Sequence, residues 1–278
     1  MGSSFDGNDG NDGNDGNAGN STSATAGWFF ADRVDLPFVT VLDAAGNPIS
    51  ANRIAAPHFG ARNWSADWYA WLALNEFTTT AWQGITIATT IPTGAALQQE
   101  IDGLVTAAQD ERADALGEIV NQSNEFISYF LAIMMARPAS FPATNRVLNI
   151  ASLIGTFTAM YFKGKNDRPR PSQLCPALMP PLAVPGHASF PSGHSTQAHL
   201  MALCMTDVFG TLPMAGPMND DLWTLADRIA RNREIAGLHY PSDTKAGVDL
   251  ATAVHALLQP ATQTRYQASV AAAKLEWS

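Results

Sequence analysis

The sequence predicts an all-α protein, a single helical bundle with a short extended arm near its N-terminus. Two observations favour this fold class. Apolar residues recur at helical spacing in seven segments after residue 64, and no long linker divides those segments into separate domains. Hydrophobic residues make up 46% of the chain, which is enough for a full core, whereas charged residues make up only 15%. A compact body is therefore expected.

The N-terminal end is predicted to differ from the rest of the chain. Residues 6–17 repeat Asp-Gly-Asn, and a segment so polar and glycine-rich cannot bury enough apolar surface to offset its ordering entropy. Residues 1–27 are therefore expected to form a disordered tail. The single domain then covers residues 28–278. It opens with the extended arm over 38–49, where Phe-Val-Thr-Val-Leu precedes a run of turn-forming residues.

Helices and one long loop follow the arm. The segments with apolar residues at helical spacing are 65–90, 95–136, 144–162, 192–209, 220–237, 243–258 and 260–275. Residues suited to helix N-caps stand at or near four of these starts: Ser65, Thr93, Thr144 and Ser192. The loop over 163–191 contains seven prolines, and irregular stretches of this length in compact domains are usually functional or disordered.

Charge, cysteine content and hydropathy exclude several classes of protein. The formal net charge is −9, so no nucleic-acid-binding surface is expected. Cys175 and Cys204 are the only cysteines, and their spacing predicts neither a zinc site nor a disulfide framework. The sequence begins without a signal peptide, and no apolar stretch is long enough for a membrane span. A soluble protein is therefore expected, and it would be periplasmic or secreted if a signal peptide was removed. Its apolar helices carry several tryptophans, which is compatible with a homodimer.

Two clusters of chemically active residues flank the proline-rich loop. The first runs from Lys163 to Pro171 at the end of an apolar helix and holds four basic residues against one acid. The second is the Pro-Ser-Gly-His at 191–194, which opens a helix. The backbone N–H groups and the positive end of the dipole at such a helix start attract an anion. Cations from the first cluster would serve the same anion.

A third cluster follows at 233–243 and contains a histidine with a carboxylate partner. Gly237 and Pro241 are expected to end one helix and begin the next, which leaves His239 on the turn between them. Asp243 then lies close enough to hold one ring nitrogen of His239 and fix its tautomer.

Together the clusters suit phosphoryl transfer without a metal. The available cations are Lys163, Arg170 and Arg233. They can neutralise the oxygens of a tetrahedral dianion, and no cluster has the ligand spacing of a metal site. His239, oriented by Asp243, can attack phosphorus, while His194 can protonate the leaving alkoxide and then activate water.

The spacings K-x6-R-P, P-S-G-H and R-x5-H-x3-D resemble the three-part signature of the PAP2 superfamily. That superfamily includes nonspecific acid phosphatases, lipid phosphate phosphatases and vanadium-dependent haloperoxidases. The resemblance covers residues 144–258 and implies a helical bundle of the PAP2 and vanadium haloperoxidase type. It assigns phosphate binding to Lys163, Arg170, Arg233, Ser192 and Gly193, the acid role to His194, the nucleophile to His239 and its orientation to Asp243. Asn232 departs from the signature, which usually has serine there.

The resemblance implies two different activities. An acid phosphatase would use a phosphohistidine, take a small phosphorylated substrate and need no cofactor. A haloperoxidase would hold vanadate in the same site with His239 as its ligand, and His187 lies where vanadium bromoperoxidases carry a histidine that influences halide oxidation. Haloperoxidases typically have an aromatic residue before the final aspartate, where this chain has Ser242, so the phosphatase is favoured. A binding module without chemistry is disfavoured by the intact His194, His239 and Asp243. The natural substrate stays open.

Residues outside the signature have ordinary explanations. Lys165 and Arg168, which lie between signature positions, are predicted to be solvated charges. His199 and His255 are predicted to be packed histidines. Four tryptophans recur near helical spacing and are predicted to belong to the core: Trp64, Trp68, Trp71 and Trp82.

Overall fold

The computed structural model describes residues 44–46 and 64–278, and in these residues the regular secondary structure is entirely helical. This confirms the predicted all-α class for the described part of the chain. Residues 65–278 lie in one compact unit. The predicted tail over 1–27 lies outside the described residues, and so does the predicted arm over 38–49 apart from a turn at 44–46. The division at residue 28 stays a prediction.

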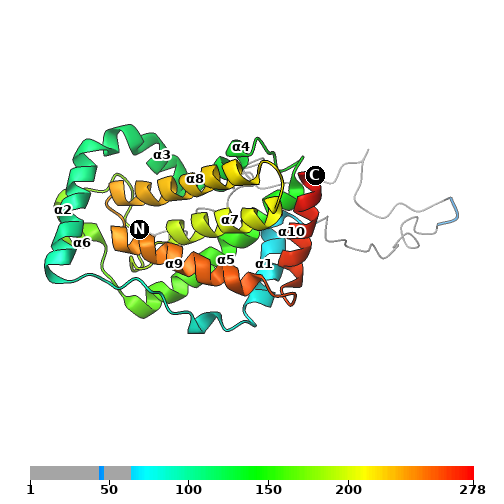
Figure 1. Cartoon of the computed structure of the whole chain (residues 1–278), viewed down its shortest axis with the longest axis horizontal. Coiled ribbons are helices and arrows are strands. Elements are labelled where there is room, and N and C mark those ends of the chain that lie inside the picture. Colours follow the sequence, from blue (N-terminus) through cyan, green and yellow to red (C-terminus); the bar gives the residue numbers. More distant parts are fainter. Residues whose placement is uncertain (1–43, 47–63) are drawn as a thin grey trace. The chain divides into compact units, whose positions relative to one another are not determined.

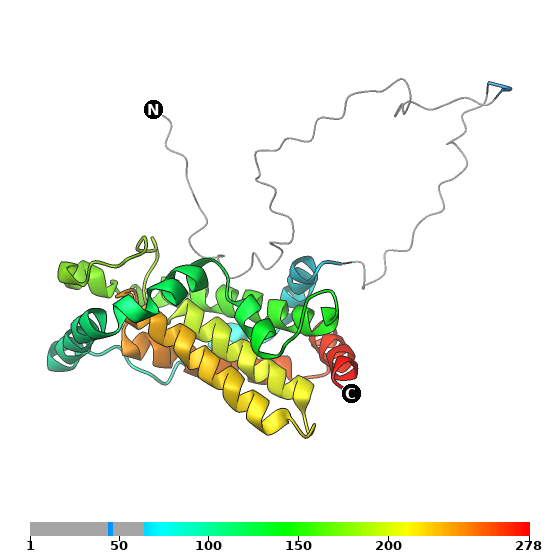
Figure 2. The same cartoon turned by 90° about the horizontal axis from the view of Figure 1, so that it is seen from above.

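The described helices run in the following order. They are α1 (Ala66–Phe77), η2 (Trp82–Gly84), α2 (Gly94–Asp110), α3 (Arg112–Asn124), α4 (Ile127–Ile133), α5 (Pro142–Asn166), α6 (Pro171–Leu174), η3 (Pro176–Leu178), α7 (Gly193–Phe209), α8 (Ala215–Ile235), α9 (Pro241–Leu258) and α10 (Thr264–Glu276). Figures 1 and 2 place α2 and α6 at one end of this body and α1 and α10 at the other. None of the described helices is long and apolar enough to cross a lipid bilayer.

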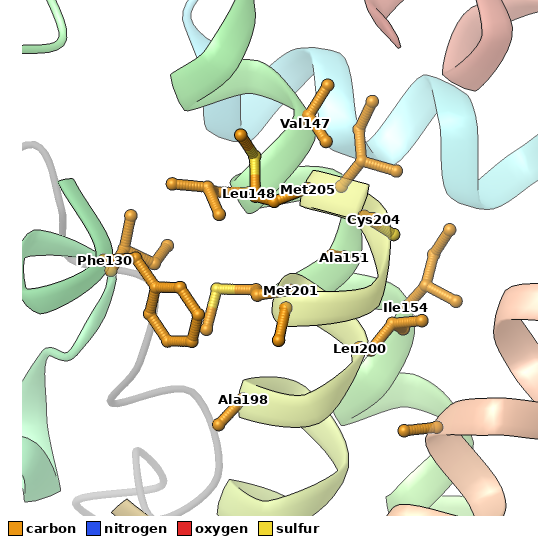
Figure 3. Close-up of a cluster of buried hydrophobic side chains, with 14 of the residues drawn as sticks. Phe130, Val147, Leu148, Ala151, Ile154, Ala198, Leu200, Met201, Cys204 and Met205 are labelled. Atoms are coloured by element: carbon orange, nitrogen blue, oxygen red, sulfur yellow. The ribbon is translucent and has the colours of Figure 1, made fainter. Parts of the chain in front are cut away.

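The core is centred on α7, which packs against α5, α8 and α9. Most of α7 is buried among these helices: its C-terminal part is largely apolar, as expected for a surrounded helix, and its first turns carry buried polar residues such as Ser195, Thr196 and Gln197. Figure 3 shows the contact between α7 and α5, formed by fully buried side chains that include Val147, Leu148, Ala151, Ile154, Leu200, Met201, Cys204 and Met205. Both cysteines are free thiols, so no disulfide bond links these helices.

Two glycines set how closely α5 and α9 approach α7. A Cβ at Gly155 would lie 3.0 Å from a backbone carbon of α7, and a Cβ at Gly247 would lie 2.6 Å from Ser195 Cβ. A side chain at either position would force the helices apart. The close approach brings the first turns of α7 and α9 together, where the Ser192 N–H donates to the Asp243 carbonyl oxygen at 2.9 Å.

The predicted helix over 65–90 is too long. The helix α1 ends at Phe77, and the hydroxyls of Thr78, Thr79 and Thr80 each donate to a carbonyl three residues earlier. Hydroxyl bonds of this kind compete with the helical ladder. Beyond the short turn η2, the chain to residue 93 is not helical.

The predicted helical segment 95–136 is divided into α2, α3 and α4. The first break falls at Glu111, where the chain turns so that both α2 and α3 contact α8. The predicted cap Thr144 is also wrong, because α5 begins at Pro142 and the Thr144 hydroxyl instead donates to Glu276 at 2.7 Å. The predicted cap Ser192 is confirmed, since its side chain accepts the Ser195 N–H at 3.3 Å.

The four tryptophans do not share one environment. Trp82 is buried against the rings of Phe157 and Tyr161, both with centroids 4.7 Å away. Trp68 and Trp71 are 62% and 52% exposed, and Trp64 is 36% exposed. The core prediction is therefore wrong for these three. Trp68 and Trp71 are exposed because α1 buries its opposite face, which carries Tyr69, Ala70, Ala73, Leu74 and Phe77. Trp64 precedes α1.

Candidate active site

A cavity of about 330 Å³ lies where the C-terminal end of α5 meets the turns that begin α7 and α9. Seven of the predicted site residues line it: Lys163, Arg170, His187, Gly193, His194, Arg233 and His239. Ser192 and Asp243 lie behind this lining and are fully buried. The structure therefore brings the three sequence clusters to a single place.

His239 lies on the predicted turn between α8 and α9. Gly237 has a φ of 75°, which favours glycine, and Pro241 begins α9. His239 Nδ1 lies 3.1 Å from Asp243 Oδ2, and its Nε2 lies 3.0 Å from Arg170 Nη1. Because a carboxylate accepts and a guanidinium donates, the proton is at Nδ1 and the lone pair is at Nε2. Burial, reinforced by Arg170, lowers the pKa of His239 well below its usual value, so the ring is neutral at neutral pH.

Asp243 is held by donors on both of its oxygens. Arg168 Nη1 donates to Oδ1 at 2.7 Å, and the Tyr240 N–H donates to Oδ2 at 3.1 Å. Burial raises the pKa of the Asp243 carboxyl, and Arg168 opposes that rise. The prediction of a solvated Arg168 is wrong, because the residue is only 4% exposed and its guanidinium lies 3.7 Å from the Tyr240 ring centroid. Lys165 is exposed, as expected.

Lys163, Arg170 and Arg233, here called the cation cage, are almost completely buried at 2%, 1% and 1% exposure. Backbone carbonyls hold each of them in place. Lys163 Nζ donates to Ala188 O and Ser189 O at 2.8 and 3.0 Å, Arg170 donates to His187 O and Leu238 O at 3.1 and 3.0 Å, and Arg233 Nη2 donates to Ile119 O at 2.6 Å. The cage is thus fixed by the loop after α6, by the turn before α9 and by α3.

The cage has more positive charge than the surrounding residues compensate. Within residues 64–278, none of its three members forms an ion pair with a carboxylate, and Arg233 Nε is buried there without a hydrogen-bond partner. Burial lowers the pKa of Arg170 and of Arg233 to about 10, and it lowers the pKa of Lys163 well below its usual value. Buried cations are costly unless paired. The arrangement is that of a site for an anion with several oxygens.

His194 lies in the first turn of α7. Its Nε2 is 3.1 Å from the Gln122 carbonyl oxygen at the end of α3, and its ring lies beside that of Phe126 with centroids 5.2 Å apart. Because a carbonyl can only accept, the Nε2 carries a proton in this arrangement. Burial and then Arg233 lower the pKa of His194 well below its usual value. A bound anion would offset the charge of Arg233 and raise that pKa.

His187 also belongs to the site. Its Nδ1 lies 3.0 Å from Arg170 Nη2, and its ring lines the cavity. The remaining walls are mostly apolar and are formed by Val120, Ala159, Met160, Leu182, Ala183, Pro185 and Leu238, with Ser123, Thr156 and Gln197 as polar exceptions. The cavity therefore combines a charged floor with apolar sides.

Several groups that hold the site residues in place belong to α2 and α3, two helices for which the sequence analysis predicts no role in the site. Ile119 O and Gln122 O hold Arg233 and His194, and Glu100 holds Arg168 at 3.0 Å. Backbone carbonyls carry no sequence signature, so spacing could not have found them. The departure Asn232 is explained by the same helices, since its amide donates to Glu118 and to Gln122 of α3 at 3.1 and 2.8 Å.

Part of this chain matches a known protein family. Residues 145–267 match the model of the PAP2 superfamily. The matched region contains the cation cage, both histidines and Asp243. In the described residues, no group of three His, Cys, Asp or Glu side chains could hold a metal ion.

Two characterised relatives are decaprenylphosphoryl-5-phosphoribose phosphatases of Mycobacterium tuberculosis, strains CDC 1551 / Oshkosh and ATCC 25618 / H37Rv. Each is 32% identical over 112 residues, which cover 40% of this chain and 58% of the relative. The chain therefore matches little more than half the length of these relatives. A solved structure, the transmembrane PAP2 type phosphatidylglycerolphosphate phosphatase from Bacillus subtilis, has 16% identity and a TM-score of 0.33 over 70% of this chain and 94% of that one.

Proposed function

We propose that this chain is a phosphatase that hydrolyses phosphomonoesters through a phosphohistidine on His239, in the manner of an acid phosphatase and without a metal. One observation carries the proposal. Three buried cations that lack a carboxylate partner in residues 64–278 surround a histidine whose Nε2 lone pair is fixed by Asp243. The two Mycobacterium relatives are phosphatases, which supports the same activity.

In the first step a phosphate dianion binds in the cation cage, and His239 Nε2 attacks phosphorus. Arg170, which donates to that nitrogen at 3.0 Å, turns its N–H toward a phosphate oxygen. The new N–P bond forms as the bond to the leaving oxygen breaks, and protonated His194 gives that oxygen the proton on Nδ1, the ring nitrogen that is not bonded to Gln122 O. The imidazolium character that develops on His239 is stabilised by Asp243.

In the second step water hydrolyses the phosphohistidine. His194, now without its extra proton, takes one from water, the water oxygen attacks phosphorus, and the N–P bond breaks to restore His239. This sequence requires His194 to be protonated when substrate binds. Its lowered pKa means that protonation needs both the bound dianion and mildly acidic pH, which is why we propose the acid phosphatase type.

The walls of the cavity indicate the leaving group. Above the charged floor most lining side chains are apolar, with Met160, Leu182 and Leu238 among the larger ones. An apolar leaving group would keep these walls dry, whereas a sugar would lose hydrogen bonds with water that the walls cannot replace. We therefore expect aryl and alkyl phosphates to be hydrolysed faster than hexose phosphates.

The proposal is tested by phosphate release from p-nitrophenyl phosphate at mildly acidic pH. His239→Ala should abolish release, because no other residue in the cavity is placed as the nucleophile. When the reaction of the wild type with radiolabelled substrate is stopped rapidly without acid, the label should be found on His239. The matched control is His255→Ala, a histidine of α9 that contacts Asp207 and is not part of the cavity lining. Normal turnover in His239→Ala, or label on another residue, would refute the mechanism.

A second candidate function rests on His187. Its contact with Arg170 and its place in the cavity wall would set it beside an oxyanion bound in the cage. Vanadate would be held by the same donors, with His239 Nε2 as its protein ligand, and when bound it would supply the activation of peroxide for halide oxidation. Peroxide-dependent bromination of a phenol after vanadate addition, reduced in His187→Ala, would favour the haloperoxidase over the phosphatase.

A further inference from the structure

A carboxylate of α2 is connected to Asp243 through one arginine. Arg168 Nη1 donates to Asp243 Oδ1 at 2.7 Å, and Arg168 Nη2 donates to Glu100 Oε2 at 3.0 Å. The three side chains are 3%, 0% and 14% exposed in the order Arg168, Asp243, Glu100. Asp243 in turn holds His239 Nδ1 with its other oxygen. The result is a continuous chain of alternating charge that ends at the proposed nucleophile.

Glu100 also fixes the helix from which Asp243 projects. Its Oε1 accepts the Ser242 N–H at 2.7 Å, and its Oε2 accepts the Ser242 hydroxyl at 3.0 Å. A carboxylate at this position satisfies a free N–H of the first helical turn of α9 and interacts favourably with its dipole. Glu100 therefore holds both the side chain that orients Asp243 and the backbone that carries it.

The arginine between the two carboxylates has one defined orientation. Its guanidinium lies over the Tyr240 ring at 3.7 Å, and Nη1 also donates to Ser242 Oγ at 2.7 Å. A planar fork held in this way can serve two carboxylates at once, which a lysine ammonium cannot do with the same geometry. Without Arg168, Asp243 Oδ1 would be buried without its charged donor.

We propose that Glu100 and Arg168 are positioning residues for the proposed hydrolysis, because they fix the Asp243 carboxylate and thereby the direction of His239 Nε2. This inference rests on the proposed function of the site, yet Glu100 lies outside the signature region and outside the matched residues 145–267. Neither residue lines the cavity, so each acts through Asp243.

The kinetic consequence differs from that of losing a phosphate contact. Variants of Glu100 and Arg168 leave the cation cage unchanged, so substrate should still bind, whereas the attack by His239 should slow. In metal sites, replacing a residue that holds a ligating histidine commonly lowers activity by about 10–100-fold. By the same reasoning, we expect kcat to fall by about tenfold or more and KM to change by less than about twofold.

The test uses Glu100→Gln and a matched control, Glu76→Gln. Glu76 holds the start of α10 in the same way: it accepts the Arg265 N–H at 2.9 Å and the Thr264 hydroxyl at 2.8 Å, and it pairs with Arg265 Nε at 3.2 Å. In each variant the glutamine places an amide N–H where a carboxylate oxygen of the wild type accepts a hydrogen bond. Both variants should therefore lose stability, but only Glu100→Gln should lower kcat. An equal kcat in the two variants would overturn the proposal.

A double-mutant cycle tests whether Glu100 acts through Arg168. Once Arg168→Gln is present, adding Glu100→Gln should lower kcat further by less than about twofold, because coupled residues are not additive. Fully multiplicative losses would contradict the proposed connection. If Arg168→Gln fails to fold, the comparison of Glu100→Gln with Glu76→Gln decides.

A measurement without substrate separates this inference from the proposed function. Imidazole ¹⁵N NMR should show a single tautomer of His239, protonated at Nδ1, in the wild type and in Glu76→Gln, and a mixture of tautomers in Glu100→Gln. If the wild type hydrolyses no phosphomonoester but this difference is seen, the proposed function fails and the positioning role stands. If the His239 spectrum is the same in all three proteins, the positioning role fails whatever the activity.

Discussion

Arg170 and Arg233 are buried cations, and their removal should affect anion binding more than the removal of an exposed cation. Arg233 Nε is buried without a partner in residues 64–278, whereas the ammonium of Lys165, in the last turn of α5, is exposed and lies 5.3 Å from the Tyr161 ring centroid. A planar fork directed at two oxygens loses more on removal than a solvated amine. The positions of these three cations therefore predict different consequences for anion binding.

The first prediction concerns orthovanadate, which accepts five ligands and resembles the phosphoryl transition state. Vanadate should bind more tightly than phosphate. Arg170→Ala and Arg233→Ala should each weaken vanadate binding by at least about tenfold, which corresponds to about 1.4 kcal/mol. Lys165→Ala is the control and should change it little. Calorimetric titration checks the ranking, and a Lys165 effect as large as that of either arginine would mean that the cage is built differently.

The second prediction concerns pH. The folded chain lowers the pKa of His194 below its ordinary 6.5, so between the two values the unfolded chain binds more protons than the folded one. Stability is then fully present above about pH 6.5 and falls as pH decreases, by up to about 1.4 kcal/mol per pH unit for one histidine. Urea unfolding at pH 7.5 and 5.5 should show a larger loss in the wild type than in His194→Gln. Equal losses would contradict the assigned shift.

The sequence could predict most of the site because its residues are fixed by chemistry and spacing. The cation cage, His239 and Asp243 were predicted from charge and from the turn at Gly237. Arg168 was not, since a basic residue between two others has no pattern that separates a buried fork from a solvated charge. Its burial depends on Glu100, which lies 68 residues earlier in the chain.

At the scale of helices, the contact between α7 and α9 determines the geometry of the site. Gly247 allows the two helices to approach until the Ser192 N–H reaches the Asp243 carbonyl oxygen at 2.9 Å. His239 lies four residues before Asp243, so a displacement of α9 would move this histidine relative to His194 on α7. The spacing of these two helices is in this way linked to the distance between the proposed acid, His194, and the proposed nucleophile, His239.

The third prediction follows from that contact. Gly247→Ala would place a Cβ 2.6 Å from Ser195 Cβ, and overpacking of this kind costs about 1–3 kcal/mol. Both the unfolding free energy and kcat should fall. Gly103→Ala in α2 is the control, because a Cβ there meets nothing within 4 Å, and it should stabilise the protein by about 0.5–1 kcal/mol. Normal kcat in Gly247→Ala would show that the helix spacing tolerates the change.

Helix boundaries were less predictable than helix existence. Periodicity detects which face is apolar, but it does not detect a break that leaves the period intact, and so it missed the division of 95–136 at Glu111. It also predicted burial for Trp68 and Trp71, although α1 places them on the face opposite Ala70 and Ala73. Hydrophobic residues at helical spacing therefore predict the presence of a helix more reliably than they predict which of its side chains are buried.

At the scale of the whole molecule, the positive charge at the site is supplied by side chains. In the described residues these charges come from α5, from the loop after it and from the end of α8. A net charge of −9 over the chain leaves the site as a local positive region in an acidic protein. Steering of an anionic substrate would then be short-ranged and sensitive to salt.

The fourth prediction is that chelation with EDTA leaves phosphate release unchanged. The reason is that Lys163, Arg170 and Arg233 already supply the neutralising charge that a divalent ion provides in other phosphatases. The measurement is initial rate before and after EDTA and gel filtration, with a metal-dependent phosphatase as the assay control. A loss that Mg²⁺ or Zn²⁺ restores would show that the site works differently.

The carbonyls of α3 that hold His194 and Arg233 have a consequence for protein engineering. A graft of residues 144–258 onto another helical scaffold would transplant every signature side chain but leave behind Ile119 O, Gln122 O and Glu100. Such a chimera should retain the signature side chains, but most of the contacts that hold His194, Arg233 and Arg168 in place would be lost. The smallest segment that could carry the whole proposed site would thus have to begin no later than the first residues of α2.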